Sequence, residues 1–199
     1  GEDIRLTNSV ALYLGTVTTA SDNSDATLGA GGDLTVTGTD VAFNGALTGV
    51  EDLVAEATTG GITQTAAVVA TGQVDLDAAT TIVLQDNGND FGTVVNAGGT
   101  GTGNATSISL RDSGSITLGD IDTADLLVET LANGNIVDNG NGAAAGDDIN
   151  STGSATLLAN GTGNVVLDDA NSDFATVVNV TGDTVTLVDA TDIVIAAAT

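Results

Sequence analysis

The residues of this sequence that could do chemistry are almost all acidic. Two adjacent pairs, Asp147 with Asp148 and Asp168 with Asp169, supply the two carboxyl groups that carbohydrate-cleaving enzymes use as acid and base. Such catalysis needs one carboxyl group with a raised pKa, usually through burial, whereas both pairs lie in turn-like sequence. The chain also has no His, Lys or Cys, and only 2% aromatic residues on which a sugar could stack. We therefore expect solvated corners here and no enzymatic activity.

Calcium binding is the sharper alternative for the same residues. Two short clusters carry hard oxygen ligands at the close spacing that Ca²⁺ accepts: Asp86, Asn87, Asn89 and Asp90, and Asp168, Asp169, Asn171 and Asp173. Neither cluster has the glycine and the distant glutamate of an EF-hand loop, and tandem GGxGxD nonapeptides are missing. The sequence thus requires no cofactor. Specific Ca²⁺ sites and turn-capping Asp and Asn residues with diffuse counterions both stay open.

The net charge limits the possible partners. The formal charge is −25, because 27 acidic residues face only two basic ones, Arg5 and Arg111. Nucleic-acid binding is excluded because it requires clustered basic residues, and an anionic membrane surface would repel the chain. No apolar run is long enough to span a bilayer, so we expect no direct membrane insertion by this segment. Cations are the expected small partners.

The acidic clusters belong to a long internal repeat. The block that begins at Leu84 recurs 83 positions later at Leu167, with Phe91 matching Phe174 and Asn96 matching Asn179. A second set of aliphatic anchors recurs at offsets of 104 and 77, which gives approximate units of 4–107, 108–184 and an incomplete 185–199. An elastic period is typical of a solenoid, which tolerates the addition of about one coil. We therefore predict one continuous solenoid over 1–199, cut from a longer repeat protein.

Short strands are expected throughout the repeat. Aliphatic residues alternate with mostly hydroxylated ones, as in 81–84 and 107–110, and each run is followed by Gly, Asn or Asp. Strand centres recur about every twenty residues, and no proline interrupts the pairing. This pattern predicts an all-β, right-handed parallel β-helix of roughly ten coils. Tandem β-sandwiches are the alternative, although the scarcity of aromatic core residues disfavours them.

Two further features of the repeat are predicted to have structural roles. Phe91 and Phe174 each precede a Thr-Val-Val run, and we predict that both are core residues that fill a wide corner of the coil. Asn96, Asn179 and the other turn asparagines are expected to form amide ladders inside the solenoid.

The repeats resemble those of filamentous-haemagglutinin-like exoproteins. The likeness extends over nearly the whole chain and is carried by the segments 32–36, 61–64, 81–84 and 89–91. That resemblance implies a very large secreted bacterial adhesin, a right-handed parallel β-helix that acts in attachment, aggregation or biofilm formation. It implies an extracellular or cell-surface location, and partners that are cell-surface or matrix components.

Two functions follow as expectations. The first is a structural and adhesive stalk segment of a giant secreted or surface-anchored adhesin. The second is a subunit of an extracellular filament or surface layer, in which copies of the chain assemble by end-to-end stacking or by divalent-cation bridging.

Overall fold

The described part of the protein is built from β-strands alone. The computed structural model describes residues 3–19, 32–99, 105–140 and 148–197, and no helix occurs among them. All twenty strands belong to one sheet. The strands are β1 (Ile4–Thr7), β2 (Leu12–Leu14), β3 (Val17–Thr18), β4 (Gly32–Gly38), β5 (Val41–Phe43), β6 (Leu47–Ala57), β7 (Ile62–Gln64), β8 (Val68–Ala70), β9 (Gln73–Ala78), β10 (Thr81–Leu84), β11 (Val94–Gly98), β12 (Ala105–Asp112), β13 (Ile116–Thr130), β14 (Ile136–Asp138), β15 (Ile149–Ser151), β16 (Ala155–Ala159), β17 (Val165–Leu167), β18 (Asp173–Phe174), β19 (Val177–Thr181) and β20 (Val185–Leu187).

The strands stack in three series, which we call the first, second and third faces. The first face contains β1, β4, residues 50–57 of β6, β9, β11, residues 118–123 of β13, β15 and β18. The second contains β2, β5, β7, β10, β12, residues 126–130 of β13, β16 and β19. The third contains β3, residues 47–50 of β6, β8, residues 116–118 of β13, β14, β17 and β20.

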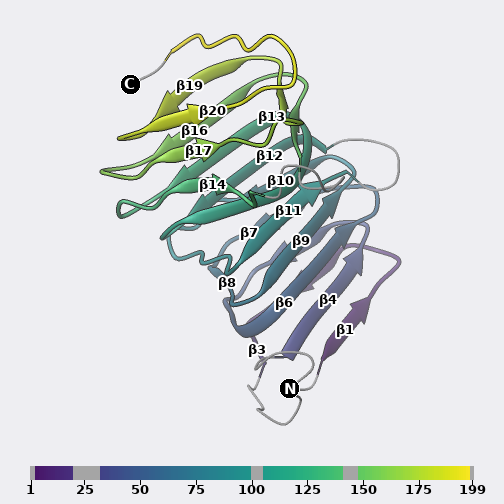
Figure 1. Ribbon diagram of the computed structural model, residues 1–199. Helices are drawn as coiled ribbons and strands as arrows, with labels where there is room; N and C mark the ends of the chain where they lie inside the picture. Colours follow the sequence, from purple (N-terminus) through teal and green to yellow (C-terminus); the bar gives the residue numbers. More distant parts are fainter. Residues whose placement is uncertain (1–2, 20–31, 100–104, 141–147, 198–199) are drawn as a thin grey trace.

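Every pairing between these strands is parallel, and the chain visits the three faces in turn. Figure 1 shows the resulting stack, which progresses from the purple N-terminal strands to the yellow C-terminal strands, with the two termini at opposite ends. β13 is long enough to pass over all three faces, since successive parts of it pair with β14, β15 and β16. The fold is therefore a parallel, solenoid-like sheet that encloses its own core, as the sequence pattern predicts.

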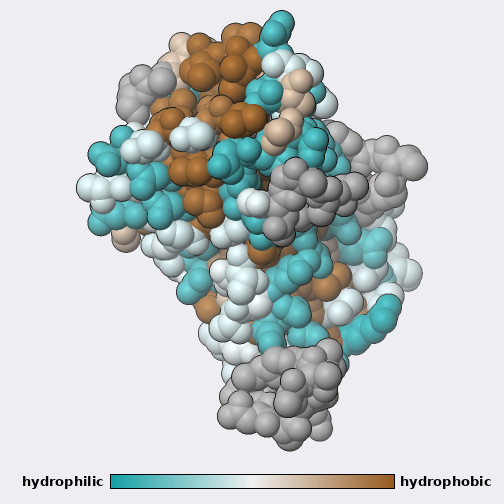
Figure 2. All heavy atoms as spheres, in the orientation of Figure 1, coloured by the Kyte–Doolittle hydropathy of each residue, from teal (hydrophilic) through white to brown (hydrophobic). Residues whose placement is uncertain are grey.

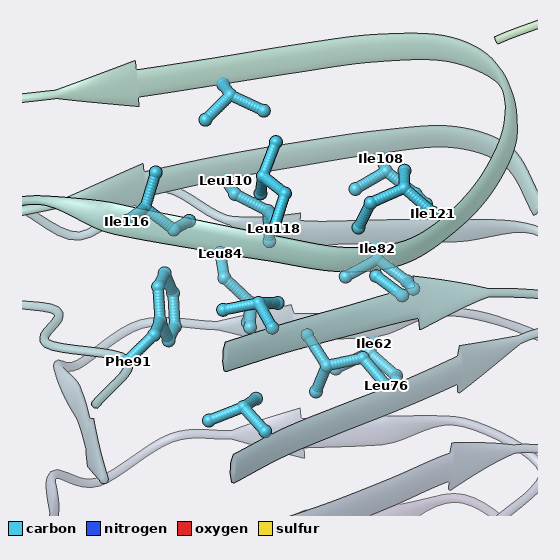
Figure 3. Packing of buried hydrophobic residues seen from close by; sticks show 14 of the residues in the cluster. Ile62, Leu76, Ile82, Leu84, Phe91, Ile108, Leu110, Ile116, Leu118 and Ile121 are labelled. Atoms are coloured by element: carbon cyan, nitrogen blue, oxygen red, sulfur yellow. The ribbon is translucent and has the colours of Figure 1, made fainter. Parts of the chain in front are cut away.

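The alternation of aliphatic and polar residues gives each strand an inner and an outer side. β4 alternates between buried and half-buried residues along its whole length, as expected for a strand whose side chains point in opposite directions in succession. Inward residues stack on their equivalents in neighbouring strands, for example Leu34 on Leu53 and Leu53 on Val74, all of them fully buried. Figure 3 shows the same stacking for Ile62, Ile82 and Ile108.

Tandem β-sandwiches, the alternative expectation, are wrong for the described residues. A sandwich of that kind is built from antiparallel strands, whereas the strand pairs here are all parallel. The physical reason is the core: inward aliphatic side chains of each coil stack on those of the next coil, so one parallel sheet encloses them. No helix among the described residues is long and apolar enough to cross a membrane.

Candidate functional site

The two acidic clusters lie in equivalent turns of the repeat. The first turn follows β10 and spans residues 85–91, and the second follows β17 and ends in β18. In each turn an equivalent carboxylate accepts a backbone N–H two residues later: Gly88 donates to Oδ1 of Asp86 (2.9 Å), and Asn171 donates to Oδ1 of Asp169 (2.8 Å). These carboxylates therefore close the turns, as Asp commonly does.

A buried polar side chain in each turn forms hydrogen bonds with a neighbouring coil. Asn89 has no exposed surface, and its Oδ1 accepts the N–H of Val68 at 2.9 Å, while its Nδ2 donates to the carbonyl of Arg111 at 3.1 Å. At the equivalent place, the Oγ of fully buried Ser172 accepts the N–H of Ile149 at 3.1 Å. The turn thus satisfies backbone groups that would otherwise be buried without a partner.

Each turn ends in a buried phenylalanine. Phe91 is 2% exposed and Phe174 is fully buried, so the prediction that both are core residues is confirmed. Figure 3 shows Phe91 at the edge of the core beside Leu84 and Ile116. The N–H of Phe91 donates to Oδ2 of Asp112 (2.9 Å), and that of Phe174 donates to Oδ2 of Asp189 (2.7 Å). The same hydrogen bond, from the backbone of a phenylalanine to an aspartate later in the chain, therefore recurs in both units of the repeat.

Asp112 is a buried carboxylate of this arrangement with a raised pKa. It is 1% exposed, and burial raises its pKa, although hydrogen bonds from the backbones of Phe91 and Gly114 lower it in part. The nearby charge of Asp90 also raises the pKa. Its two oxygen atoms are both occupied by backbone donors, which gives Asp112 a structural role.

The structure does not gather the predicted calcium ligands around one point. Among residues 3–19, 32–99, 105–140 and 148–197, no group of three or more acidic residues is placed to hold a metal ion. Asp173 accepts a hydrogen bond from the hydroxyl of Thr191 (3.1 Å), and Asn87 accepts one from Arg111 (3.0 Å). Specific calcium binding by either cluster would therefore require these side chains to move.

The candidate acid–base pairs are not arranged alike. Asp147 lies outside the described residues, and its neighbour Asp148 is half-buried, with an enclosed Oδ1 that has no hydrogen-bond partner in the described part of the chain. Asp168 is exposed, but Asp169 is only 3% exposed, so the expected solvated corner is wrong for Asp169. The cause is Asp138 on the preceding coil, whose Oδ2 accepts the N–H groups of both residues and holds the turn inward.

Acidic residues also form rows along the first face. Successive backbone N–H groups donate to the aspartate of the coil before: Asp52 to Asp33 (3.3 Å) and Gln73 to Asp52 (2.6 Å). Glu56 and Asp77 lie directly opposite each other in register. Burial raises the pKa of Asp77, and the charges of Glu56 and Asp75 raise it further. Burial likewise raises the pKa of Asp33.

Asparagine ladders occur, but on the outer side of the sheet and at the corners. Asn96 is half-buried; it donates to Asp75 (2.6 Å) and accepts the N–H of Asp120 (3.0 Å), which joins three successive strands. A second ladder runs through Asn135 and Asn164, where each Oδ1 accepts an N–H from the next coil. The predicted position inside the solenoid is therefore wrong for Asn96, because its neighbours Val95 and Ala97 take the inward positions.

Arg111 is the main cationic centre of the described chain. Its Nη2 forms an ion pair with Glu129 at 2.7 Å, and its Nη1 donates to the carbonyl of Gln85 (2.9 Å) as well as to Asn87. The guanidinium group therefore clamps the first acidic turn against the next coil. The corresponding turn in the second half has no arginine.

A polar depression of about 420 Å³ lies beside the second acidic turn. Asp122, Asn150 and Asp173 line it from three successive strands, and their Cα atoms are in register. Sequence reasoning missed this grouping, as well as the roles of Asp112 and Asp138. For Asp112 a signal was present, because Asp189 follows it at the same offset of 77 that relates the aliphatic anchors.

The family of repeats of unknown function (DUF5649) matches this chain over residues 31–98 and 103–181. No curated protein and no solved structure matches it significantly.

The two matched segments start on different faces of the solenoid. The first runs from β4 to β11, which both lie on the first face, and the second runs from β12 to β19, which both lie on the second. Equivalent residues of the two matched segments therefore lie on adjacent faces of the solenoid. For example, Phe91 follows Asp90, which pairs with Val69 on the third face, whereas Phe174 pairs with Ser151 on the first face.

Proposed function

The chain belongs to this family of repeats of unknown function, and from that premise we propose that it is a stalk segment of a large extracellular adhesin. In this proposal the segment supplies reach and stiffness. It projects binding regions of the parent protein from the cell surface toward cell-surface or matrix components, in attachment, aggregation or biofilm formation.

The observation that carries the proposal is the unbroken parallel pairing from β1 to β20. In such a stack every coil hydrogen-bonds with the coils before and after it, so a load along the rod is shared by many backbone bonds. The resemblance of the repeats to those of filamentous-haemagglutinin-like adhesins supports the same conclusion and suggests secretion.

We also propose that the solenoid is right-handed. A parallel strand–connection–strand unit is right-handed in nearly all proteins, because of strand twist. The first face contributes one strand to each coil, and its series supports eight coils among the described residues, near the roughly ten expected for the whole chain. On this count each family unit covers three coils and one additional face.

The offset of one face has a functional consequence within this proposal. Equivalent outer surfaces of successive units point in different directions around the rod, so a rod of several units presents its repeated surface on every side. Such a display suits a stalk that meets neighbours from several directions. The hydroxyl-rich and acidic outer residues keep it soluble.

Sedimentation velocity and negative-stain imaging, each in Ca²⁺ and then in EDTA, test the proposal. Short single rods in both conditions are the expected result for a passive stalk. Compact particles with no elongated shape would contradict it. A second test compares the attachment of cells to surfaces coated with the parent protein, with and without this segment. Removal of the segment should reduce attachment because the rod is shorter, whereas the binding affinity for a soluble receptor should not change.

A filament subunit is the second candidate, and one observation favours it. Figure 2 shows hydrophobic surface gathered toward the C-terminal strands, where Val178, Val185, Val194 and Ile195 are each more than a third exposed. At the other end, Tyr13 is 68% exposed. A second copy that stacked there would cover these side chains and extend the ladder. Long fibres in the imaging experiment, especially fibres that EDTA dissolves, would favour this function over the stalk.

A further inference from the structure

The first acidic turn places two reactive groups around one asparagine side chain. Asn87 and Gly88 are both exposed. The N–H of Gly88 donates to Oδ1 of Asp86 at 2.9 Å, and the side-chain oxygen of Asn87 accepts a hydrogen bond from Nη1 of Arg111 at 3.0 Å. The backbone nitrogen that follows the asparagine thus faces a base, while the asparagine amide faces a fixed positive charge.

We propose that Asn87 is a site of self-catalysed deamidation through a succinimide. The nitrogen of Gly88 forms a bond to Cγ of Asn87, and its proton passes through the carboxylate of Asp86 to the departing amide nitrogen. The Cγ–Nδ2 bond then breaks and ammonia leaves. Water opens the cyclic imide at either carbonyl carbon, so the products are aspartate and isoaspartate at position 87.

Each neighbour has a defined part in this reaction. Arg111 stabilises the negative charge that develops on the Asn87 oxygen when Gly88 attacks, as a donor in an oxyanion hole does. Asp86 acts as the proton acceptor within hydrogen-bond reach. Gly88 has no Cβ to obstruct the approach of its nitrogen, and its exposed position admits the water that opens the ring.

Other Asn-Gly pairs of the described chain lack this combination. Gly45 and Gly134 donate their N–H groups to main-chain carbonyls, which are poor bases. The side chain of Asn160 donates to Glu129 (3.1 Å) and to the carbonyl of Thr130 (2.9 Å), so its amide is held by acceptors and not by a cation.

Asn139 provides a matched control within the same molecule. The sequence Asp138-Asn139-Gly140 repeats Asp86-Asn87-Gly88, and Gly140 donates to Oδ1 of Asp138 at 3.2 Å. The two turns thus share the base and the glycine. Of the two turns, only the first contacts Arg111. Gly140 also has a positive φ of 65°, so the Arg111→Gln variant, and not the comparison of the two turns alone, isolates the guanidinium group.

The reaction would change the clamp that holds the turn. The new carboxylate faces Arg111 and adds one negative charge to a chain whose formal charge is already −25. In the isoaspartate product the backbone also gains one methylene group at position 87, two residues before the buried Asn89. We infer that slow modification tightens the contact with Arg111 in the aspartate form and loosens the turn in the isoaspartate form.

The test is peptide mapping by mass spectrometry after the whole chain has been incubated in heavy-oxygen water at neutral and mildly alkaline pH. Heavy oxygen should enter Asn87 about tenfold faster than Asn139. Arg111→Gln should lower the rate at Asn87 about tenfold and leave the rate at Asn139 unchanged. Equal rates at the two sites in the natural chain would overturn the proposal.

The direction of the Arg111→Gln effect separates chemistry from unfolding. Loss of the ion pair with Glu129 could loosen the turn, but loosening accelerates deamidation, so an unchanged or faster rate at Asn87 would also overturn the proposal. Glu129→Gln removes the same ion pair and keeps the guanidinium group. This variant should retain fast modification, and a fall to the Arg111→Gln rate would exclude the guanidinium as the cause.

Discussion

At the scale of single residues, Phe174 is the clearest test of how the coil corners are filled. Its side chain is fully buried, and its N–H is tied to Asp189. Phe174→Ala should lower the free energy of unfolding by about 3 kcal/mol or more, because it leaves a cavity that the small neighbouring side chains cannot close. Chemical denaturation measures the loss. Val178→Ala, at a 38% exposed position four residues later, is the control and should change stability little.

Asp77 tests how far repulsion between carboxylates on neighbouring strands lowers the stability of the fold. It lies directly opposite Glu56, and its pKa is raised by burial and by the charges of Glu56 and Asp75. Asp77→Asn removes the repulsion and should stabilise the fold by about 0.5 kcal/mol at neutral pH. Asp183→Asn, at an exposed turn, should have no such effect. Equal melting temperatures for the natural chain and Asp77→Asn would contradict the expectation.

The same raised pKa values give a sign for the pH dependence. Asp33, Asp77 and Asp112 bind protons more tightly in the folded chain than their ordinary value of 3.8 allows. Folding is therefore favoured as the pH falls from neutral through their folded pKa values, and the gain is complete below 3.8. Asp125 acts in the opposite sense, since its hydrogen bonds with Ser154 lower its pKa. Asp77→Asn should reduce the stabilisation that melting curves show on mild acidification.

At the scale of elements, the coil is the unit that the sequence can add or lose. Leu34 pairs with Leu53, and Leu53 with Val74, so removal of residues 53–73 would place Val74 opposite Leu34 in the same register. We expect this variant to melt cooperatively at a lower temperature, because nearest-neighbour coils supply the stability.

A shorter excision is the control for that variant. Removal of residues 53–63 takes out about half a coil, so the following strands would meet the wrong face of the stack. This variant should lose cooperative melting when it is followed by circular dichroism. If both excisions gave equally stable proteins, the coil would not be the structural unit.

At the scale of the whole molecule, charge sets the dependence on ions. Two carboxylates stacked ~4.8 Å apart repel each other by ~0.9 kcal/mol even in fully aqueous surroundings. With a formal charge of −25 and only two basic residues, the chain has little internal compensation. We expect low salt or EDTA to lower the melting temperature and NaCl or Ca²⁺ to raise it. A melting temperature that is the same in all four conditions would refute this expectation.

The response to the two salts distinguishes specific calcium binding from screening. Screening depends on ionic strength, so a matched ionic strength of NaCl should reproduce the effect of Ca²⁺. A larger effect of Ca²⁺ would indicate a site, and Asp173→Asn in the second acidic turn would then remove the excess. Asp183→Asn again serves as the control.

The sequence by itself determined the kind of element and the identity of the core. Alternation of aliphatic and hydroxylated residues marks strands with one buried side, and the repeated Phe91 and Phe174 are buried as predicted. These properties are local or periodic, and a spacing of two or of about twenty residues is visible in the chain itself. The turn roles of Asp86 and Asp169 follow from the same local chemistry, since the donor is only two residues away.

Only the tertiary structure decided which residues meet across coils. Asp138 holds the turn that contains Asp169, and Asp112 accepts from Phe91, although these partners are separated by 31 and 21 positions. The connections between strands vary in length, so the sequence period does not fix which residue of the next coil lies opposite. For the same reason the sideways displacement of the repeat by one face is invisible in the sequence: it depends on how many strands fit around one coil, and packing of the enclosed side chains sets that number.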